Sequence, residues 1–127
     1  YRPEVDFALK KGAPSYITED IEPMLATGQV KWLDGEEGWI DCYIKFTHSG
    51  GHCPQHVVYL IDDGKDKVFY GGDEAPQLKQ LKMRYVAKYD FDGKKAMELR
   101  ARYAEQGRAE AWKFLFYHDV KSAVGSF

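Results

Sequence analysis

The densest group of chemically active side chains lies in a nine-residue segment that runs from His48 to His56. The segment contains three of the four histidines of the chain, His48, His52 and His56, together with Cys53. Imidazole and thiolate groups are the preferred protein ligands of zinc and copper, and a glycine-containing loop can fold around one ion. The spacing therefore predicts a metal site formed by His48, His52, Cys53 and His56. Because no second pair of ligands follows, as in zinc knuckles, the same segment also fits an exposed hairpin loop.

The two cysteines of the chain, Cys42 and Cys53, allow two further interpretations. A disulfide between them would tie the histidine-rich loop to the preceding strand, provided that the loop folds back toward Cys42. Alternatively, no disulfide forms, with Cys42 on an apolar strand face and Cys53 exposed. A nucleophilic Cys53 beside His52 lacks the sequence context of known cysteine enzymes, so no catalytic residue is assigned.

Acidic residues gather at expected turns and at a helix start, where carboxylates cap helices and face water. A calcium loop that begins at Asp90 is excluded, because its twelfth position is Ala101 and not the required glutamate. The Gly71-Gly72 pair does not form a phosphate-binding loop, since Asp73 and Glu74 follow it and would repel a phosphate. None of these clusters predicts a binding site.

Aromatic residues are numerous, with 3 Trp, 9 Tyr and 7 Phe in 127 residues, and exceed what one small core accommodates. Aromatic side chains anchor protein interfaces, and they also line apolar ligand pockets. The sequence predicts a partner-binding surface made of Trp32, Trp39, Tyr43, Trp112, Phe114 and Tyr117. The alternative is a ligand pocket between sheet and helix, lined by Tyr85, Tyr89, Phe91 and Trp112.

Charge is nearly balanced overall, with a formal net charge of −2, but it is unevenly distributed. Residues 1–77 carry a net charge of −7, whereas residues 78–127 carry +5. The overall balance argues against a protein that binds nucleic acid over its whole surface. The longest apolar run, residues 57–61, is far shorter than the ~20 residues of a transmembrane helix.

Period-two alternation and apolar runs indicate strands in the middle of the chain. Five segments have this character: residues 30–33, 39–47, 56–62, 67–71 and 81–91. An Asp-Asp-Gly-Lys turn at residues 62–65 joins two of them, since Asp and Gly tolerate turn conformations. The segment that ends at Phe91 shows the cleanest alternation.

Helices are expected toward both ends of the chain. The first is predicted to be capped by Ser15 or Thr18, with Pro23 in its first turn and Gly28 at its end. A longer helix is predicted over residues 94–106, where good helix formers follow a possible cap at Asp92. Residues 108–124 are predicted to continue as helix, and a strand over residues 112–117 is the alternative.

These elements predict an α+β fold in one globular domain that comprises residues 1–127. An antiparallel meander of four to five strands is packed by a short N-terminal helix and a long C-terminal helical segment. The arrangement resembles the cystatin-like and nuclear-transport-factor-2-like cone folds in architecture, and architecture alone does not determine function.

The functional hypothesis is a non-enzymatic interaction module, such as an accessory subunit, an inhibitor or an effector. Its partner is expected to be another protein. A small apolar ligand, bound by a cone-type domain, and a metal bound by the His48–His56 loop are the alternatives. Neither nucleic acid nor a cofactor is expected. The cellular compartment is left open, and Tyr1 in place of a methionine suggests processing of a soluble chain.

Overall fold

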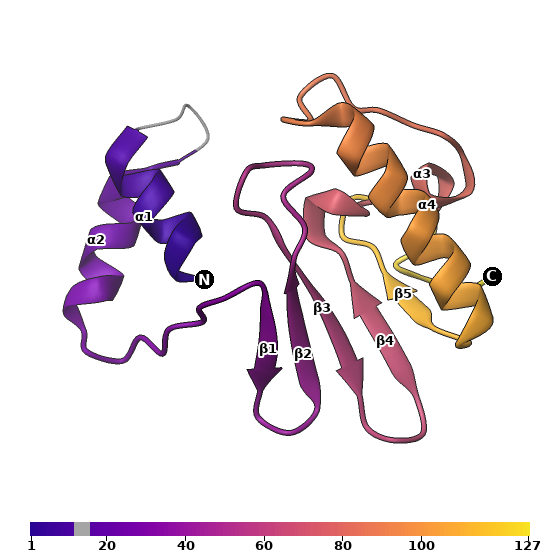
Figure 1. Ribbon diagram of the computed structural model, residues 1–127, viewed down its shortest axis with the longest axis horizontal. Coiled ribbons are helices and arrows are strands. Elements are labelled where there is room, and N and C mark those ends of the chain that lie inside the picture. Colours follow the sequence, from indigo (N-terminus) through magenta and orange to yellow (C-terminus); the bar gives the residue numbers. More distant parts are fainter. Residues whose placement is uncertain (12–15) are drawn as a thin grey trace. The chain divides into compact units, whose positions relative to one another are not determined.

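The computed structural model describes residues 1–11 and 16–127. Contacts divide the chain into two compact units, residues 1–35 and residues 36–127. The first unit is helical, and the second contains a six-stranded sheet with its connecting helices (Figure 1). Among the described residues, no helix has the length and apolar character that crossing a bilayer requires.

The first unit consists of α1 (Arg2–Lys11), α2 (Thr18–Ala26) and an irregular segment that leads to Gly35. The strand predicted over residues 30–33 is wrong, because these residues belong to the irregular segment. Arg2 ties the start of α1 to the same segment, since its backbone N–H donates to the carbonyl of Leu33 at 2.9 Å. Its guanidinium lies 4.5 Å from the ring centre of Trp32. This tryptophan therefore makes a cation–π contact within its own unit.

The start of α2 differs from the prediction. Thr18 is the first helical residue, and the preceding Ile17 makes no side-chain cap; Ser15 lies outside the described residues. Pro23 is therefore well inside the helix and not in its first turn. Proline lacks the N–H that would bond to the carbonyl of Glu19, and both residues lie on an exposed part of the helix. Gly28 follows the C-cap and has a φ of 68°. This left-handed conformation confirms its predicted role as the terminating residue.

The second unit is built on one sheet whose strands follow each other in chain order. The strands are β1 (Glu37–Ile40), β2 (Ile44–His48), β3 (Val57–Asp62), β4 (Lys67–Tyr70), β5 (Lys113–Leu115) and β6 (Val124–Gly125). All neighbours are antiparallel except β4 and β5, which are parallel. The mixed α+β class is confirmed, but the sheet is larger than predicted and partly parallel.

Two further predicted strands are wrong. Residues 39–47 form a hairpin in which Ile40 pairs with Ile44, because Asp41 adopts a φ of 56° and reverses the chain. Residues 81–91 form the end of α3 (Leu78–Lys82) and a loop. The loop has its own polar anchor, since the Asp90 carboxylate accepts from the backbone N–H of Ala87 at 2.7 Å. Local alternation thus resembled that of a strand in a segment that pairs with no strand of the sheet.

A parallel pair needs a crossover connection, and here η1 (Gly72–Glu74), α3 and α4 (Gly93–Ala109) supply it. The predicted cap of α4 is confirmed, because the Asp92 side chain accepts from the N–H of Lys95 at 2.9 Å. The expected helical continuation to residue 124 is wrong. Ala111 has a φ of 55°, and the chain turns there into β5, which agrees with the strand alternative.

The core lies between α4 and strands β4 and β5. Phe69, Trp112 and Phe114 form its centre, with Trp112 stacked on Phe69 at 5.4 Å between ring centres. The predicted role of Trp112 and Phe114 in a partner surface is therefore wrong, since both are buried. The backbone of α4 approaches this cluster so closely that a Cβ on Gly107 would lie 2.2 Å from the Phe114 ring.

Candidate functional site

The strand directions bring three chain segments to one edge of the sheet. β2 and β4 both run antiparallel to β3, and β5 runs parallel to β4, so these three strands end at the same edge. The loop that contains His52 follows β2, Asp73 follows β4 within η1, and His118 follows β5. Polar side chains that directly follow such strand ends are well placed to form a shared site.

The loop after β2 uses two of its histidines to hold its own shape. The His48 ring contacts the Glu36 carboxylate through Nδ1 at 3.0 Å and the carbonyl of Pro54 through Nε2 at 2.9 Å. The His56 ring contacts Ser49 Oγ through Nδ1 at 3.0 Å. These contacts close the loop, and they direct both rings to different neighbours.

The predicted set of His48, His52, Cys53 and His56 is consequently not brought to one point. The rings of His52 and His56 are adjacent, with centres 5.9 Å apart, but among the described residues no three such side chains could hold one ion. The predicted Cys42–Cys53 disulfide is not formed in the described residues. Cys42 lies in the β1–β2 turn and Cys53 beyond the far end of β2, so the whole length of that strand separates them. A disulfide requires its two residues to be close neighbours in space, which this separation prevents.

His52 is the histidine of this loop that faces Asp73. Its backbone N–H and that of Gly51 donate to Glu74 Oε2 at 3.2 and 3.1 Å, and the Glu74 side chain is fully buried. Gly51 is needed for this approach, since a Cβ there would lie 2.5 Å from the Glu74 carboxylate. His52 Nδ1 contacts Asp90 Oδ1 at 3.1 Å, which leaves Nε2 directed at Asp73 Oδ2, 3.6 Å away.

Asp90 is held from its other side by Arg100 of α4. The pair is enclosed, with Arg100 Nη1 and Nη2 donating to the two carboxylate oxygens at 2.9 and 3.0 Å. Burial opposes ionisation of Asp90, but the bonds from Arg100, from the Ala87 backbone and from His52 outweigh it. The pKa of the Asp90 carboxyl therefore lies below its usual value. An ionised Asp90 keeps the proton of His52 on Nδ1 and the Nε2 lone pair available to bind.

His118 approaches Asp73 from the opposite side. Its Nε2 lies 3.4 Å from Asp73 Oδ1, its ring packs on Tyr117 at 4.0 Å between centres, and its carbonyl accepts from Gln77. The Tyr117 hydroxyl donates to Asp73 Oδ1. Burial, reinforced by this carboxylate, raises the pKa of the Tyr117 phenol above its usual value, so the hydroxyl stays protonated and remains a donor.

The donor set fits transition-metal binding. Two ligands of one tetrahedral zinc ion, each bound at about 2.0 to 2.1 Å, lie about 3.3 Å from each other. The two nitrogen–oxygen separations, 3.6 Å at His52 and 3.4 Å at His118, are close to that value. Among the described residues, no three His, Cys, Asp or Glu side chains surround a single ion. The arrangement is instead two pairs of donors that share the Asp73 carboxylate.

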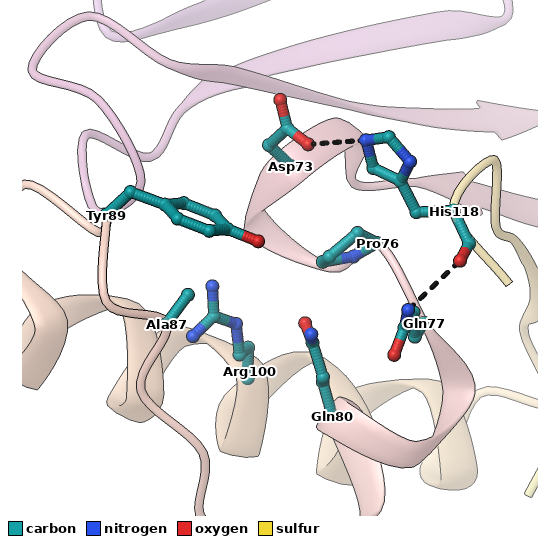
Figure 2. A pocket seen from close by; sticks show the side chains of 8 residues that line it. All are labelled: Asp73, Pro76, Gln77, Gln80, Ala87, Tyr89, Arg100 and His118. Atoms are coloured by element: carbon teal, nitrogen blue, oxygen red, sulfur yellow. Dashed lines mark hydrogen bonds and ion pairs between the residues drawn. The ribbon is translucent and has the colours of Figure 1, made fainter.

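A cavity of about 200 Å³ adjoins this cluster (Figure 2). It is lined by Asp73, Pro76, Gln77, Gln80, Ala87, Tyr89, Arg100 and His118. Of the predicted ligand pocket, Tyr89 lies at this cavity, whereas Trp112 is in the core and Tyr85 and Phe91 are exposed elsewhere on the loop. A pocket of about 360 Å³ does lie between the sheet and α4, and Trp112 lines it. Tyr85, Tyr89 and Phe91 are not among its lining residues, so the predicted set is not brought together there.

The predicted partner surface is likewise divided. Trp32, Trp39, Tyr43 and Tyr117 are exposed, while Trp112 and Phe114 are buried. Sequence reasoning missed Asp73, His118 and the Asp90–Arg100 pair, although Asp73 and His118 each come shortly after an apolar strand. The parallel pairing of β4 and β5 that makes this position informative is not visible in the sequence pattern.

No protein-family model and no curated protein sequence matches the chain. Solved structures with a similar fold do match. One is a probable metal-dependent hydrolase from Staphylococcus aureus, with 27% identity and a TM-score of 0.69 over 73% of this chain and 34% of that chain. Another is a dizinc quorum-quenching lactonase in complex with its product, with 18% identity and a TM-score of 0.63 over 87% of this chain and 38% of that chain.

A third is an N-acyl homoserine lactone hydrolase with its product bound at the catalytic metal centre, with 21% identity and a TM-score of 0.70. The match covers 93% of this chain and 45% of that chain, so the chain spans less than half of the length of each of these structures. The prediction of a non-enzymatic interaction module or accessory subunit is wrong, because these structures of similar fold are hydrolases and lactonases.

Proposed function

We propose that this chain carries part of the active site of a metal-dependent hydrolase, with His52, Asp73 and His118 as metal ligands. The observation that carries the proposal is the placement of two imidazole Nε2 atoms, each facing one oxygen of the same carboxylate. A carboxylate flanked in this way would hold metal together with either imidazole, and such a donor set suits the paired metals that many hydrolases use. The solved structures of similar fold include a dizinc lactonase, which supports this interpretation.

The remaining ligands come from outside this chain in the proposal. Zinc takes about four ligands, and catalytic sites keep one position for water or substrate. Each half of the cluster supplies one imidazole and one carboxylate oxygen, so about two positions per ion remain, one of them for water or substrate. A further segment of a longer protein is the source we propose, since the chain covers 34% of the S. aureus hydrolase.

The bound metal would supply Lewis-acid activation of the substrate carbonyl and a water of lowered pKa. The residues of the chain have separate tasks. Asp90 orients His52 through Nδ1, and Glu74 fixes the backbone of the same loop. Tyr117 donates a hydrogen bond to Asp73 Oδ1 and so restricts the rotation of the carboxylate. A small ester or lactone is the substrate class that the lactonase structures favour.

Zinc titration of the histidine rings tests the proposal. In long-range ¹H–¹⁵N spectra, zinc should shift the Nε2 resonances of His52 and His118. The ring of His48 serves as an internal control, because its described contacts with Glu36 and Pro54 hold the loop. Asp73→Asn should weaken zinc binding at both histidines by at least about tenfold, since it removes one anionic ligand from each pair.

The matched control is Asp66→Asn, which removes an exposed carboxylate paired with Lys113. This variant should bind zinc as the parent protein does. Equal zinc affinity for Asp73→Asn and the parent protein would refute the proposal, as would shifts that are strongest at His48.

A further inference from the structure

Gln80 is a buried polar side chain beside the cluster formed by His52, Asp73 and His118. The proposed function leaves this glutamine unexplained. It lies on α3 and is 9% exposed, and its Oε1 has no hydrogen-bond partner among the described residues. A buried acceptor that is left unpaired opposes folding, so such an atom calls for a ligand. Figure 2 shows the amide end of Gln80 directed into the cavity that also reaches Asp73 and His118.

Hydrogen-bond donors face the same cavity. Arg100 is 1% exposed and uses four of its five N–H groups on the carbonyls of Glu74 and Tyr85 and on the Asp90 carboxylate. One N–H on Nη2 remains. The Tyr89 hydroxyl points toward the middle of the cavity in Figure 2, and no described residue accepts from it. An acceptor and two donors thus line one small space.

The charge and the volume of the cavity restrict the ligand. Asp90 neutralises Arg100, and a carboxylate ligand would meet the lone pairs of Gln80 Oε1 and the negative charge of Asp73. An ammonium group would meet the Arg100 guanidinium. The cavity has a volume of about 200 Å³. Typical ligand pockets begin at about 300 Å³. The space therefore suits one polar group and not a whole ligand.

We propose that this cavity is the substrate-recognition pocket of the metal centre and that it binds a carboxamide group of the substrate. The amide N–H donates to Gln80 Oε1, and the amide carbonyl accepts from the Tyr89 hydroxyl and the remaining Arg100 N–H. Gln80 and Tyr89 are then specificity-determining residues. The inference rests on the proposed function, because the metal cluster at Asp73 is what makes the neighbouring cavity a substrate pocket.

Two small amides test the pocket directly, without a catalytic readout. N-methylacetamide has an N–H and a carbonyl, whereas N,N-dimethylacetamide has the carbonyl alone. Binding is followed by the shift of the Gln80 side-chain amide and of nearby backbone amides in ¹H–¹⁵N spectra. The protein should bind N-methylacetamide at least about tenfold more tightly, since the other compound leaves Gln80 Oε1 unpaired.

Two variants separate the role of Gln80 from that of Tyr89. Gln80→Met keeps the length of the side chain but removes the acceptor, so it should abolish the preference between the two amides. Tyr89→Phe should weaken both amides by a similar factor, because it removes a donor to the carbonyl that both contain. Gln29→Met, an exposed glutamine of the first unit, is the control and should leave both affinities unchanged. The dispersion of the backbone amide resonances, recorded without zinc, reports that each variant is folded.

The outcomes keep the two proposals apart. Equal binding of both amides by the parent protein, or a preference that survives in Gln80→Met, overturns the pocket inference even when zinc binds at Asp73. Selective amide binding without zinc binding refutes the metal centre, and with it the role of the cavity as a substrate pocket. Zinc binding at Asp73 together with selective binding of N-methylacetamide supports the inference, provided that Gln80→Met and Tyr89→Phe have the expected effects.

Discussion

Replacing Asp90 by asparagine should destabilise the protein strongly, because this carboxylate satisfies four donors in an enclosed position. Oδ2 accepts from Arg100 Nη1 and from the N–H of Ala87, and Oδ1 accepts from Arg100 Nη2 and contacts His52 Nδ1. In asparagine one oxygen becomes an NH₂ group, so two of these bonds are lost whichever way the amide turns. The buried Arg100 also loses its counter-charge.

The expected loss of unfolding free energy is about 3 to 5 kcal/mol, the usual cost of removing one partner from a buried ion pair. With a urea dependence of about 2 kcal/mol per molar, that loss lowers the unfolding midpoint by about 2 M. The assay is urea unfolding followed by tryptophan fluorescence, in a chelator, so that metal binding does not contribute. Trp112 is a suitable reporter because it is 3% exposed in the folded state.

Asp66→Asn provides the matched comparison, since it is the same substitution at an exposed ion pair with Lys113. Solvent and salt screen such a pair, and its midpoint should stay within error of the parent protein. Zinc binding gives a second readout, because a histidine without its outer carboxylate loses about 10- to 100-fold in metal affinity. Equal midpoints for Asp90→Asn and Asp66→Asn would refute the reasoning.

Three further predictions concern the core and the cysteines. Gly107→Ala places a Cβ 2.2 Å from the Phe114 ring. The overpacking, about 1 to 3 kcal/mol, should exceed the ~1 kcal/mol gain in helix propensity and lower the melting temperature, whereas a rise would contradict it. Burial raises the pKa of Tyr103 to about 12. The neutral phenol is therefore favoured by folding, and stability is complete below about pH 10 and falls as the pH rises toward 12. Tyr103→Phe should remove this alkaline loss at little cost near neutral pH, since the group that interacts with the hydroxyl is the exposed Arg102 of the same helix; an unchanged pH profile would count against it. Cys42 and Cys53 should both react with a thiol reagent in unfolded protein without reductant, and zero reactive thiols would indicate a disulfide.

The sequence by itself determined the elements whose signals are local. Asp92 caps α4 because a carboxylate at that position can reach the N–H of Lys95 without help from distant residues. The strands β3 and β4 and the turn between them follow from adjacent side chains and from Gly64, which adopts a φ of 86°. Glycine takes that conformation without steric cost. These features depend on neighbours within a few residues, and a single sequence contains that information.

The tertiary structure decided which polar residues meet. Asp73 and His118 become neighbours because β4 and β5 pair in parallel across a crossover of three helical segments, a pairing that local periodicity does not encode. The same is true of the histidine-rich loop, where packing assigns His48 to loop closure and turns His52 toward Asp73. Residue types indicated metal chemistry in that loop, but which polar side chains meet depends on strand ends that lie far apart along the chain.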